Sequence, residues 1–347
     1  MLTQEEMTGD VVSAAESDLG VRRALLLWLL FFLILFGLGY PTLNRYDPRE
    51  LGPDQQVYYN MVLNQAAGDE LPFCFRLLVP EVAKPFFLMA NGRVRSWDPV
   101  LFGLLISNCL FGATSAVLLL MVGLRAVKDL TLALLSCTLY LLNHCVPNLW
   151  LAAMVDSAEA CLMMAVTWAL FTGRWWLLPL LGVPGAMAKQ SFVPFSVMFS
   201  LTWWWADSWP RRNYRRLAWI AALGVTSGLS LMMVHWVVAG QLLTPAAMTG
   251  WWKAGGSYAG KILREFTDQN FWYVFGWLLP LGVCRLNRLP RPWVAASAAT
   301  ALLVVGIGGY ANLMGTVNRP LFSVIGPVLS LSAASLITDR RWGKAQT

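Results

Sequence analysis

Charged side chains are scarce in this sequence. Only 13% of its 347 residues are Asp, Glu, Lys or Arg, against about 25% in an average soluble domain, while 57% are hydrophobic. This shortage excludes the ordinary soluble class. Backbone N–H and C=O groups find no water inside a bilayer, so apolar stretches that cross it form helices or a closed barrel. Because the apolar stretches here are continuous rather than alternating, we predict an all-α protein whose helices cross the membrane many times.

Histidine and the common catalytic motifs are also rare or absent. The two histidines, His144 and His235, are too far apart in the sequence to predict a metal site. The six cysteines show no CxxC or metal-ligand spacing, and most of them lie as small apolar residues within the apolar stretches. No GxSxG, Walker or HExxH motif occurs, which argues against serine hydrolases, P-loop NTPases and zinc proteases. The sequence therefore predicts no metal-ligand set of a known type.

The positive charge is better explained by membrane orientation than by a nucleic-acid partner. The formal net charge is +7, yet the basic residues are scattered between apolar stretches and form no stripe interleaved with aromatic residues. Lys and Arg near the ends of spans are retained on the cytoplasmic side of a membrane. We therefore expect membrane lipids as partners and no nucleic acid.

Ten apolar stretches are candidate spans. Several are shorter than the ~20 residues that a full crossing needs, so we expect them to be tilted, extended or half-crossing. Whether the segment Trp175 to Trp205 forms two full spans stays open. The stretches are Ala24 to Tyr40, Pro99 to Leu124, Leu130 to Leu149, Ala158 to Thr172, Trp175 to Ala188, Phe192 to Trp205, Leu217 to Ala239, Phe271 to Cys284, Val294 to Tyr310 and Leu321 to Ile337.

Alternating these spans from a cytoplasmic N-terminus gives a consistent topology. Residues 1–21 form a cytoplasmic tail, residues 22–338 form the membrane domain, and residues 339–347 form a second cytoplasmic tail. Fifteen of the 26 basic residues then lie inside, which agrees with the charge rule. Two long loops lie outside, at 41–98 and 240–270, and we expect amphipathic helices in the first. Most acidic residues fall on or near the external side, so that is where we expect chemistry.

The first external loop carries the most unusual polar stretch, from Arg45 to Tyr59. Asp47 and Asp54 lie seven residues apart in it, among Pro and Gly residues that mark turns. A helix can begin at Asp54, so a capping role for this side chain is the alternative to a functional one. Further along, Arg76 is flanked by aromatic and aliphatic residues. Its guanidinium suits a lipid phosphate, although it could equally extend to the lipid headgroups.

Three more ionisable residues abut spans on the same side. Asp156 opens the fourth span, where helix capping would also explain it; Lys189 lies between two short apolar runs, and Arg319 precedes Pro320. Cations and carboxylates gathered on one face suit an amphiphilic phosphate-bearing substrate and a base that deprotonates a hydroxyl group.

Taken together, these motifs resemble the multi-spanning glycosyltransferases of the GT-C class, which use polyprenyl-phosphate sugars. The resemblance covers most of the chain in order. It is carried by Asp54-Gln55-Gln56-Val57-Tyr58-Tyr59, Phe73-Cys74-Phe75-Arg76-Leu77-Leu78-Val79-Pro80, Asp156, Ala188-Lys189-Gln190 and Asn318-Arg319-Pro320.

The resemblance implies an inverting transfer from a polyprenyl-phosphate sugar donor to a lipid or glycan acceptor of the cell envelope, in a bacterial inner membrane. The general base would be Asp54 or, second, Asp47. The donor phosphate would contact Arg76, Lys189 and Arg319, with Asp156, Tyr58 and Gln55 in the same pocket. A divalent metal stays open, because Asp47 and Asp54 are the only paired acids that could hold one.

Two other classes fit part of the sequence. A transporter or lipid flippase predicts ionisable groups buried within spans and related halves, and no convincing repeat is found. A non-catalytic assembly subunit predicts helix association through a small-residue face such as Gly224 to Gly228, which has GxxxG spacing.

Overall fold

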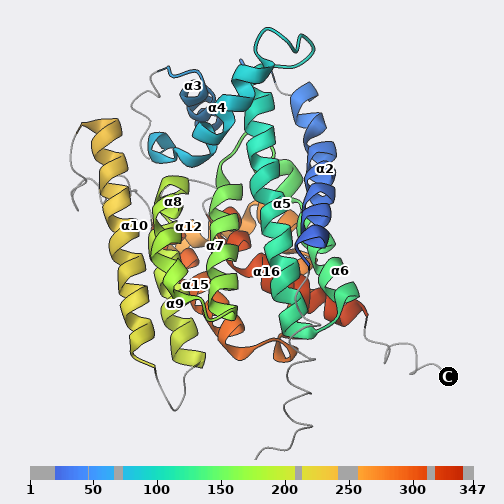
Figure 1. The fold of residues 1–347 in the computed structure, drawn as a ribbon, viewed down its shortest axis with the longest axis vertical. Coiled ribbons are helices and arrows are strands. Elements are labelled where there is room, and N and C mark those ends of the chain that lie inside the picture. Colours follow the sequence, from blue (N-terminus) through green and yellow to red (C-terminus); the bar gives the residue numbers. More distant parts are fainter. Residues whose placement is uncertain are drawn as a thin grey trace, which may run out of the picture.

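The computed structural model describes residues 20–45, 47–65, 73–207, 213–240, 257–310 and 317–338. Within these residues the chain is helical and has no strand. Figure 1 shows that most of the long helices run side by side along the longest axis of the molecule. An all-helical bundle is therefore confirmed.

Five helices are long and apolar enough to cross a membrane, judged by length and composition over the described residues. Each coincides with one of the ten expected spans, so a multi-pass membrane protein is supported. They are α2 (Val21–Arg45), α5 (Pro99–Val127), α10 (Arg215–Ala239), α15 (Arg291–Tyr310) and α16 (Asn318–Ile337).

The other five expected spans are shorter helices in the structure. Helix α6 has 12 residues, or about 18 Å at 1.5 Å per residue, whereas the apolar core of a bilayer is about 30 Å thick. These helices are α6 (Leu130–Leu141), α7 (Asp156–Phe171), α8 (Leu178–Ala188, after the 3-10 turn η3 at Trp175–Leu177), α9 (Phe192–Asp207) and the broken pair α13 (Gln269–Phe275) and α14 (Leu278–Val283).

The break after α6 has a visible cause. The Asn143 side chain accepts the Cys145 N–H at 3.0 Å and donates to the carbonyl oxygen of Val274 at 2.9 Å. The chain then continues as a π-helical turn, η2 (Val146–Trp150), which contains Pro147. Polar contacts between distant segments thus end a helix that apolar composition alone would continue.

The segment 41–98, which we expect to be the first external loop, contains helices. Helix α3 (Pro53–Val62) and helix α4 (Leu78–Ala90) lie together at one end of the bundle, joined through the 3-10 turn η1 (Phe73–Phe75) (Figure 1). Asp98 caps α5 by accepting the N–H groups of Val100 and Leu101 at 2.9 Å, and it also accepts the Tyr59 hydroxyl at 2.8 Å. This second contact fixes α3 to the start of α5.

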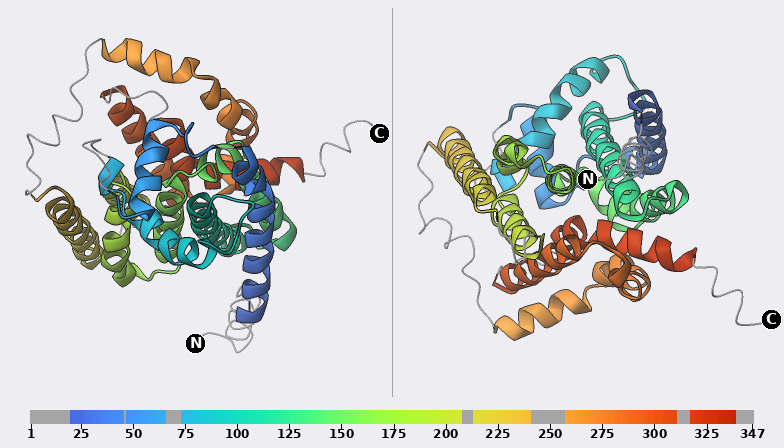
Figure 2. Two further views of the ribbon diagram at one scale, coloured as in Figure 1. Left: turned by 90° about the horizontal axis from the view of Figure 1, so that it is seen from above. Right: turned by 60° about the horizontal axis from the view of Figure 1, so that its bottom comes forward.

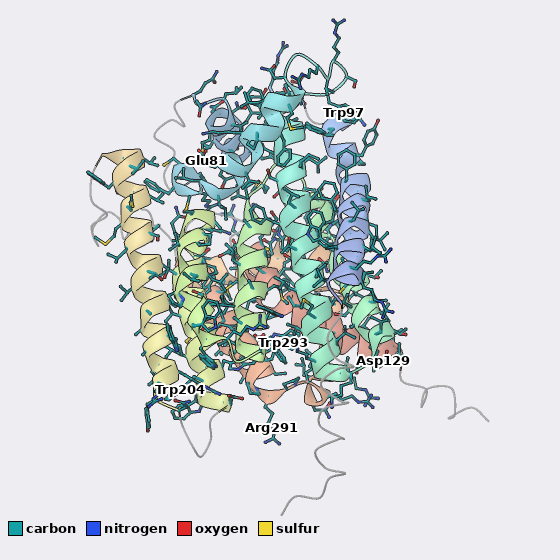
Figure 3. The ribbon with its side chains drawn as sticks, in the orientation of Figure 1. Glu81, Trp97, Asp129, Trp204, Arg291 and Trp293 are labelled. Atoms are coloured by element: carbon teal, nitrogen blue, oxygen red, sulfur yellow. The ribbon has the colours of Figure 1, made fainter. Side chains whose placement is uncertain are left out.

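The two ends of the bundle are distinct. Figure 3 shows Glu81 and Trp97 at the end that carries α3 and α4, and Trp204 and Arg291 at the opposite end. Arg291 begins α15 and Trp204 lies near the end of α9. Seen from the ends, α2, α10 and α12 (Tyr258–Thr267) lie at the periphery (Figure 2). Helices α5 and α16 are largely buried, whereas α2 and α10 expose apolar faces suited to membrane lipids.

Side-chain contacts bring the start of α16 to both α3 and the start of α7, because Arg319 lies 3.7 Å from Asp54 and 3.1 Å from Asp156. Helices α8 and α10 approach closely at Gly182, where an added Cβ would lie 2.6 Å from Thr226 Oγ1. An aromatic cluster joins α6, η2 and α16, because the Tyr140 and Phe322 rings stack at 5.1 Å and Trp150 packs edge-on against both. The remaining 3-10 turn, η4 (Leu286–Arg288), precedes α15.

Candidate functional site

A buried carboxylate, Asp156, joins three parts of the chain. It is the first residue of α7 and has no exposed surface. Lys189, between α8 and α9, donates to Asp156 Oδ1 at 2.5 Å, and Arg319, at the start of α16, donates to Oδ2 at 3.1 Å. One acidic side chain thus bridges two cations. A buried charge is costly unless it is paired and hydrogen-bonded, and these contacts meet that condition.

A second buried acid, Glu159, completes the surroundings of Lys189. Glu159 lies one helical turn after Asp156, and its Oε2 is 3.3 Å from Lys189 Nζ. The Ser191 hydroxyl donates to Glu159 Oε1 at 2.5 Å. The charge of Lys189 is therefore compensated by two carboxylates.

Asp54 is the accessible acid of the group. Its Oδ2 lies 3.7 Å from Arg319 Nη1, and both side chains are 21% exposed. Helix α3 is capped at Gly52, whose N–H is accepted by Gln55 Oε1 at 2.8 Å. The N-cap of α3 is therefore Gly52. The Asp54 carboxylate has two contacts, because its Oδ1 accepts the Gln55 N–H at 3.1 Å in the first turn while its Oδ2 faces Arg319.

The segment before Asp156 is held in a strained conformation. Ala153 has φ +59°, in the left-handed region that costs a residue with a Cβ about 1–2 kcal/mol. The carbonyl oxygens on either side are fixed, because Ala152 accepts from Gln55 at 2.5 Å and Met154 accepts from Asn108 at 2.9 Å. Distant side chains thus impose the turn from which Asp156 projects.

Arg76 is the cation without an acidic partner. It donates to the Tyr58 hydroxyl at 2.8 Å and to Gln190 Oε1 at 3.5 Å, and it lies 4.9 Å above the Phe73 ring. In the described part of the chain, no carboxylate lies within ion-pair distance of it. Burial raises the pKa of Tyr58 to about 12, so the phenol is neutral at physiological pH and leaves the charge of Arg76 uncompensated.

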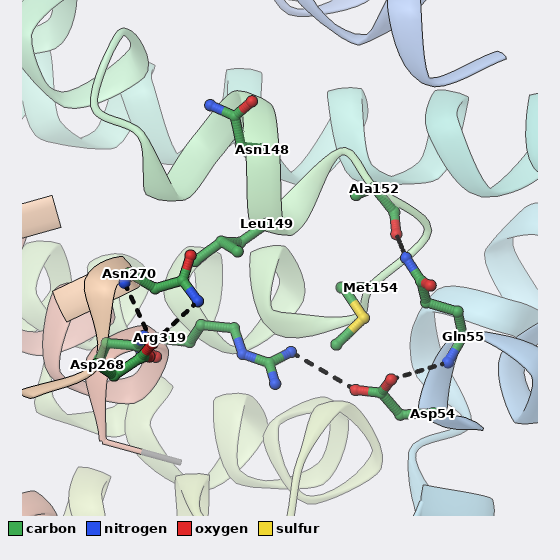
Figure 4. A pocket seen from close by; sticks show the side chains of 10 residues that line it. Asp54, Gln55, Asn148, Leu149, Ala152, Met154, Asp268, Asn270 and Arg319 are labelled. Carbon is green, nitrogen blue, oxygen red and sulfur yellow. Dashed lines mark hydrogen bonds and ion pairs between the residues drawn. The ribbon is translucent and has the colours of Figure 1, made fainter. Parts of the chain in front are cut away.

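A cavity of about 380 Å³ adjoins this cluster. It lies between the starts of α3 and α16, the turn η2 and the start of α13. Figure 4 shows Arg319 reaching from the Asp268 side of the cavity towards Asp54. The lining residues are Asp54, Gln55, Asn148, Leu149, Ala152, Met154, Asp268, Asn270, Asn318 and Arg319.

Comparison of the chain with models of known families, with curated proteins and with solved structures found no match. What the site does must therefore be inferred from its own geometry.

The structure brings together all but one of the sequence-predicted site residues. The residues that meet are Asp54, Gln55, Tyr58, Arg76, Asp156, Lys189 and Arg319. Asp47 lies apart, in an exposed turn where its Oδ1 accepts the Arg49 N–H at 2.9 Å, and it does not line the cavity. The hypothesis that Asp47 and Asp54 hold a metal together has no support in this arrangement, and metal dependence stays an open prediction.

Several polar residues of the site are not among those predicted from the sequence, namely Asn148, Glu159, Ser191, Asp268 and Asn270. Glu159 follows Asp156 by three residues, so helical spacing would have placed both acids on one face. Ser191, Asp268 and Asn270 lie in or beside short connections, where no periodic pattern indicates which side chains meet. Over the described residues, no group of three or more His, Cys, Asp or Glu side chains is placed to hold a metal ion.

Proposed function

We propose that this protein is a membrane glycosyltransferase that moves a sugar from a polyprenyl-phosphate donor to a lipid or glycan acceptor of the cell envelope. The observation that carries the proposal is the convergence of an accessible acid, Asp54, and an uncompensated cation, Arg76, on one acid–cation cluster beside a cavity. The GT-C resemblance is the reason for choosing this reaction among those that an acid and a cation can support.

Asp54 is the general base in this mechanism. It lines the cavity, and its only ion pair in the described chain is the long one to Arg319. Its carboxylate takes the proton of an acceptor hydroxyl while that oxygen attacks the anomeric carbon. The bond from this carbon to the phosphate oxygen breaks, the electron pair leaves with the polyprenyl phosphate, and the configuration inverts.

Arg76 is the principal contact for the departing phosphate. A guanidinium offers several donors in a fork that matches phosphate oxygens, and the neutral Tyr58 hydroxyl orients this fork without cancelling its charge. Lys189 and Arg319 lend weaker electrostatic support, because each already contacts two carboxylates. Asp156 is buried between these two cations and acts as a positioning residue.

The proposed topology has about ten passes, both termini in the cytoplasm and the site on the external side of a bacterial inner membrane. Support comes from the positions of Asp129, Trp204 and Arg291, which lie at the end of the bundle opposite to α3 and α4 (Figure 3). These three residues belong to connections that the charge rule assigns to the cytoplasm. The short helices would then cross the membrane where the bilayer is locally thinned.

Release of polyprenyl phosphate tests the proposal without knowledge of the acceptor. The protein in proteoliposomes is supplied with a panel of polyprenyl-phosphate hexoses and with membrane extract as the source of acceptor. Asp54→Asn is expected to lower donor-dependent release by about 10²–10⁴-fold, because the amide cannot take the proton. The matched control is Glu50→Gln, an exposed acid of the same loop, which should keep full release.

Full release by Asp54→Asn would remove this residue from the mechanism. If release is instead lost in Asp47→Asn, the base is Asp47. No release from any donor by the wild-type protein would overturn the transferase proposal.

A transporter or flippase is the second candidate, and one observation favours it. Asp156 and Glu159 are fully buried and Lys189 nearly so, as is usual where helices carry charge across a membrane. Movement of the intact donor lipid across the vesicle bilayer, with no cleavage, would support this class. For the assembly-subunit hypothesis, the supporting observation is the open space at Gly228, where an added Cβ would meet no atom within 4 Å.

A further inference from the structure

The wall of the cavity that carries Asp268 has a composition suited to hydroxyl groups. Besides this carboxylate it presents the amides of Asn270 and Asn318, and Asn148 lines the cavity from the turn η2. We propose that this wall binds a neutral sugar ring through neighbouring hydroxyl groups and is the acceptor subsite. The role of this sugar as the acceptor rests on the proposed function, whereas the binding of a neutral sugar does not.

Asp268 is held only by neutral donors. Its Oδ1 accepts the N–H and the side-chain amide of Asn270 at 3.3 and 3.4 Å, and its Oδ2 accepts the amide of Asn318 at 3.3 Å. These are long contacts, and no cation lies within ion-pair distance of Asp268 among the described residues. A sugar hydroxyl would form a shorter, charge-assisted hydrogen bond of about 2.5–2.7 Å with this carboxylate.

The amides beside Asp268 supply the complementary groups. A side-chain amide offers both donors and an acceptor, as does each hydroxyl of a diol. The amide of Asn148 donates to the His144 carbonyl oxygen at 3.3 Å, and Asn148 itself is exposed. The carboxylate and the amides together can therefore accept hydrogen bonds from two adjacent hydroxyl groups and donate hydrogen bonds to them.

The charge of the cavity selects against anions. Asp54 and Asp268 are its two acids and Arg319 is its one cation, so the lining carries a net charge of −1. Arg76, which is the uncompensated cation, is not among the lining residues. The donor phosphate is thus assigned to Arg76, outside this cavity, and the neutral sugar is assigned to the cavity itself.

The size and the remaining lining agree with one sugar ring. At about 380 Å³ the cavity is near the lower end of the range of about 300–1,000 Å³ for ligand pockets. Leu149 and Met154 offer apolar contact to the C–H groups of a ring. A polyprenyl chain is too long and too apolar for this space.

Protection of an engineered cysteine tests the assignment on the full-length protein. Asn148→Cys, which removes one lining amide and leaves Asp268, Asn270 and Asn318 in place, is made together with Cys284→Ser, because Cys284 is exposed and the other five cysteines are buried. The rate of maleimide labelling is measured with methyl glucoside, methyl mannoside or glucuronate. Neutral methyl glycosides should slow labelling at millimolar concentration, and glucuronate should need at least about ten times more, because of the net negative lining.

Asp268→Asn in the same background should raise the half-protecting concentration of the neutral glycosides about tenfold or more, because a charge-assisted hydrogen bond is lost. Asn is as good a helix cap as Asp, so the start of α13 is retained. Asn270→Ala, which keeps the carboxylate, should shift protection in the same direction. The matched control, Asp207→Asn, changes an acid at the opposite end and should leave protection unchanged.

Equal protection by glucuronate, an unchanged value in Asp268→Asn, or protection by Mg²⁺ alone would each overturn the assignment. Arg76→Gln separates it from the proposed function, since this variant should lose donor cleavage and keep sugar protection. Protection without any donor cleavage would overturn only the transferase proposal. Donor cleavage that depends on Asp54 but not on Asp268 would overturn only the subsite.

Discussion

Two ion pairs of the same length lie at opposite ends of this bundle in different surroundings. Lys189 and Asp156 are 2.5 Å apart with side chains 9% and 0% exposed, whereas Arg216 and Asp207 are also 2.5 Å apart with side chains 31% and 40% exposed. In water such a pair contributes about 0–1 kcal/mol, while breaking a buried pair costs about 3–5 kcal/mol. The distance between the charged atoms is therefore a poor guide to the cost of breaking an ion pair, which depends on how deeply the pair is buried.

The comparison also indicates why the buried charges are present. A buried ion pair is often no more stable than a well-packed apolar pair of the same size, so its retention favours a role other than stability. The exposed pair needs no such explanation. The end with α3 therefore has the features of a site, and the other end has those of an ordinary surface.

The strongest test of this difference makes the same Asp-to-Asn substitution at both ends of the bundle. Asp156→Asn should lower the free energy of unfolding by about 3–5 kcal/mol, since it leaves Lys189 and Arg319 without their shared carboxylate. The measurement is chemical denaturation in mixed micelles. Equal effects for Asp156→Asn and Asp207→Asn would show that the buried cluster is hydrated like the surface.

A smaller effect is expected at the contact that holds α3 against the strained turn. Gln55→Leu removes the bond to Ala152 and the cap of Gly52, and should cost about 1–2 kcal/mol in the same assay. Gln56→Leu is the matched control, because the one side-chain hydrogen bond of Gln56 to the described residues is with Asn60 in its own helix. If both variants are equally stable, α3 is not fixed to the site through Gln55.

The strained residue itself should give a change of opposite sign. Ala153→Gly is expected to raise the free energy of unfolding by about 0.5–1 kcal/mol, because relief of the left-handed conformation exceeds the added entropy of glycine. Ala126→Gly, within helix α5, should lower it by about 0.5–1 kcal/mol. A loss of stability in Ala153→Gly would mean that this turn is not strained.

The smallest effect belongs to the exposed pair. Asp207→Asn should cost about 0.5 kcal/mol or less at low ionic strength, and about nothing at 1 M salt, where the Debye length is about 3 Å. The cost of Asp156→Asn should change little over the same range. A salt dependence shared by both variants would contradict the contrast between the two ends.

The sequence predicts the polar cluster better than the helix boundaries. Asp156, Lys189 and Arg319 are recognisable because each stands beside an apolar run, where a charge is costly unless it has a partner or a function, and Asp54 is recognisable by its place in an unusual polar stretch. Asp47 looks equivalent to Asp54 in sequence, and only the course of the loop separates them. Local patterns carry no information on that course.

The helix breaks and the cavity wall depend on contacts between distant segments. The chain from Leu130 to Leu149 is mostly apolar, and its helix ends at Leu141, close to Asn143, which bonds to the carbonyl oxygen of Val274, 131 residues away. The position of Asp268 against Asn318 has the same origin. These features follow from tertiary packing, which overrides the local apolar pattern.

Asp156 has a consequence for how the chain is assembled. The two buried acids, Asp156 and Glu159, contact only one cation, Lys189, within the described chain before α16, so their charges are balanced only once Arg319 has arrived at the start of α16. Until α16 inserts, this pair of acids and Lys189 together carry a net charge of −1 within an otherwise apolar bundle. Insertion of α16 is therefore the step that neutralises these buried acids, and a chain that lacks α16 should fold less stably.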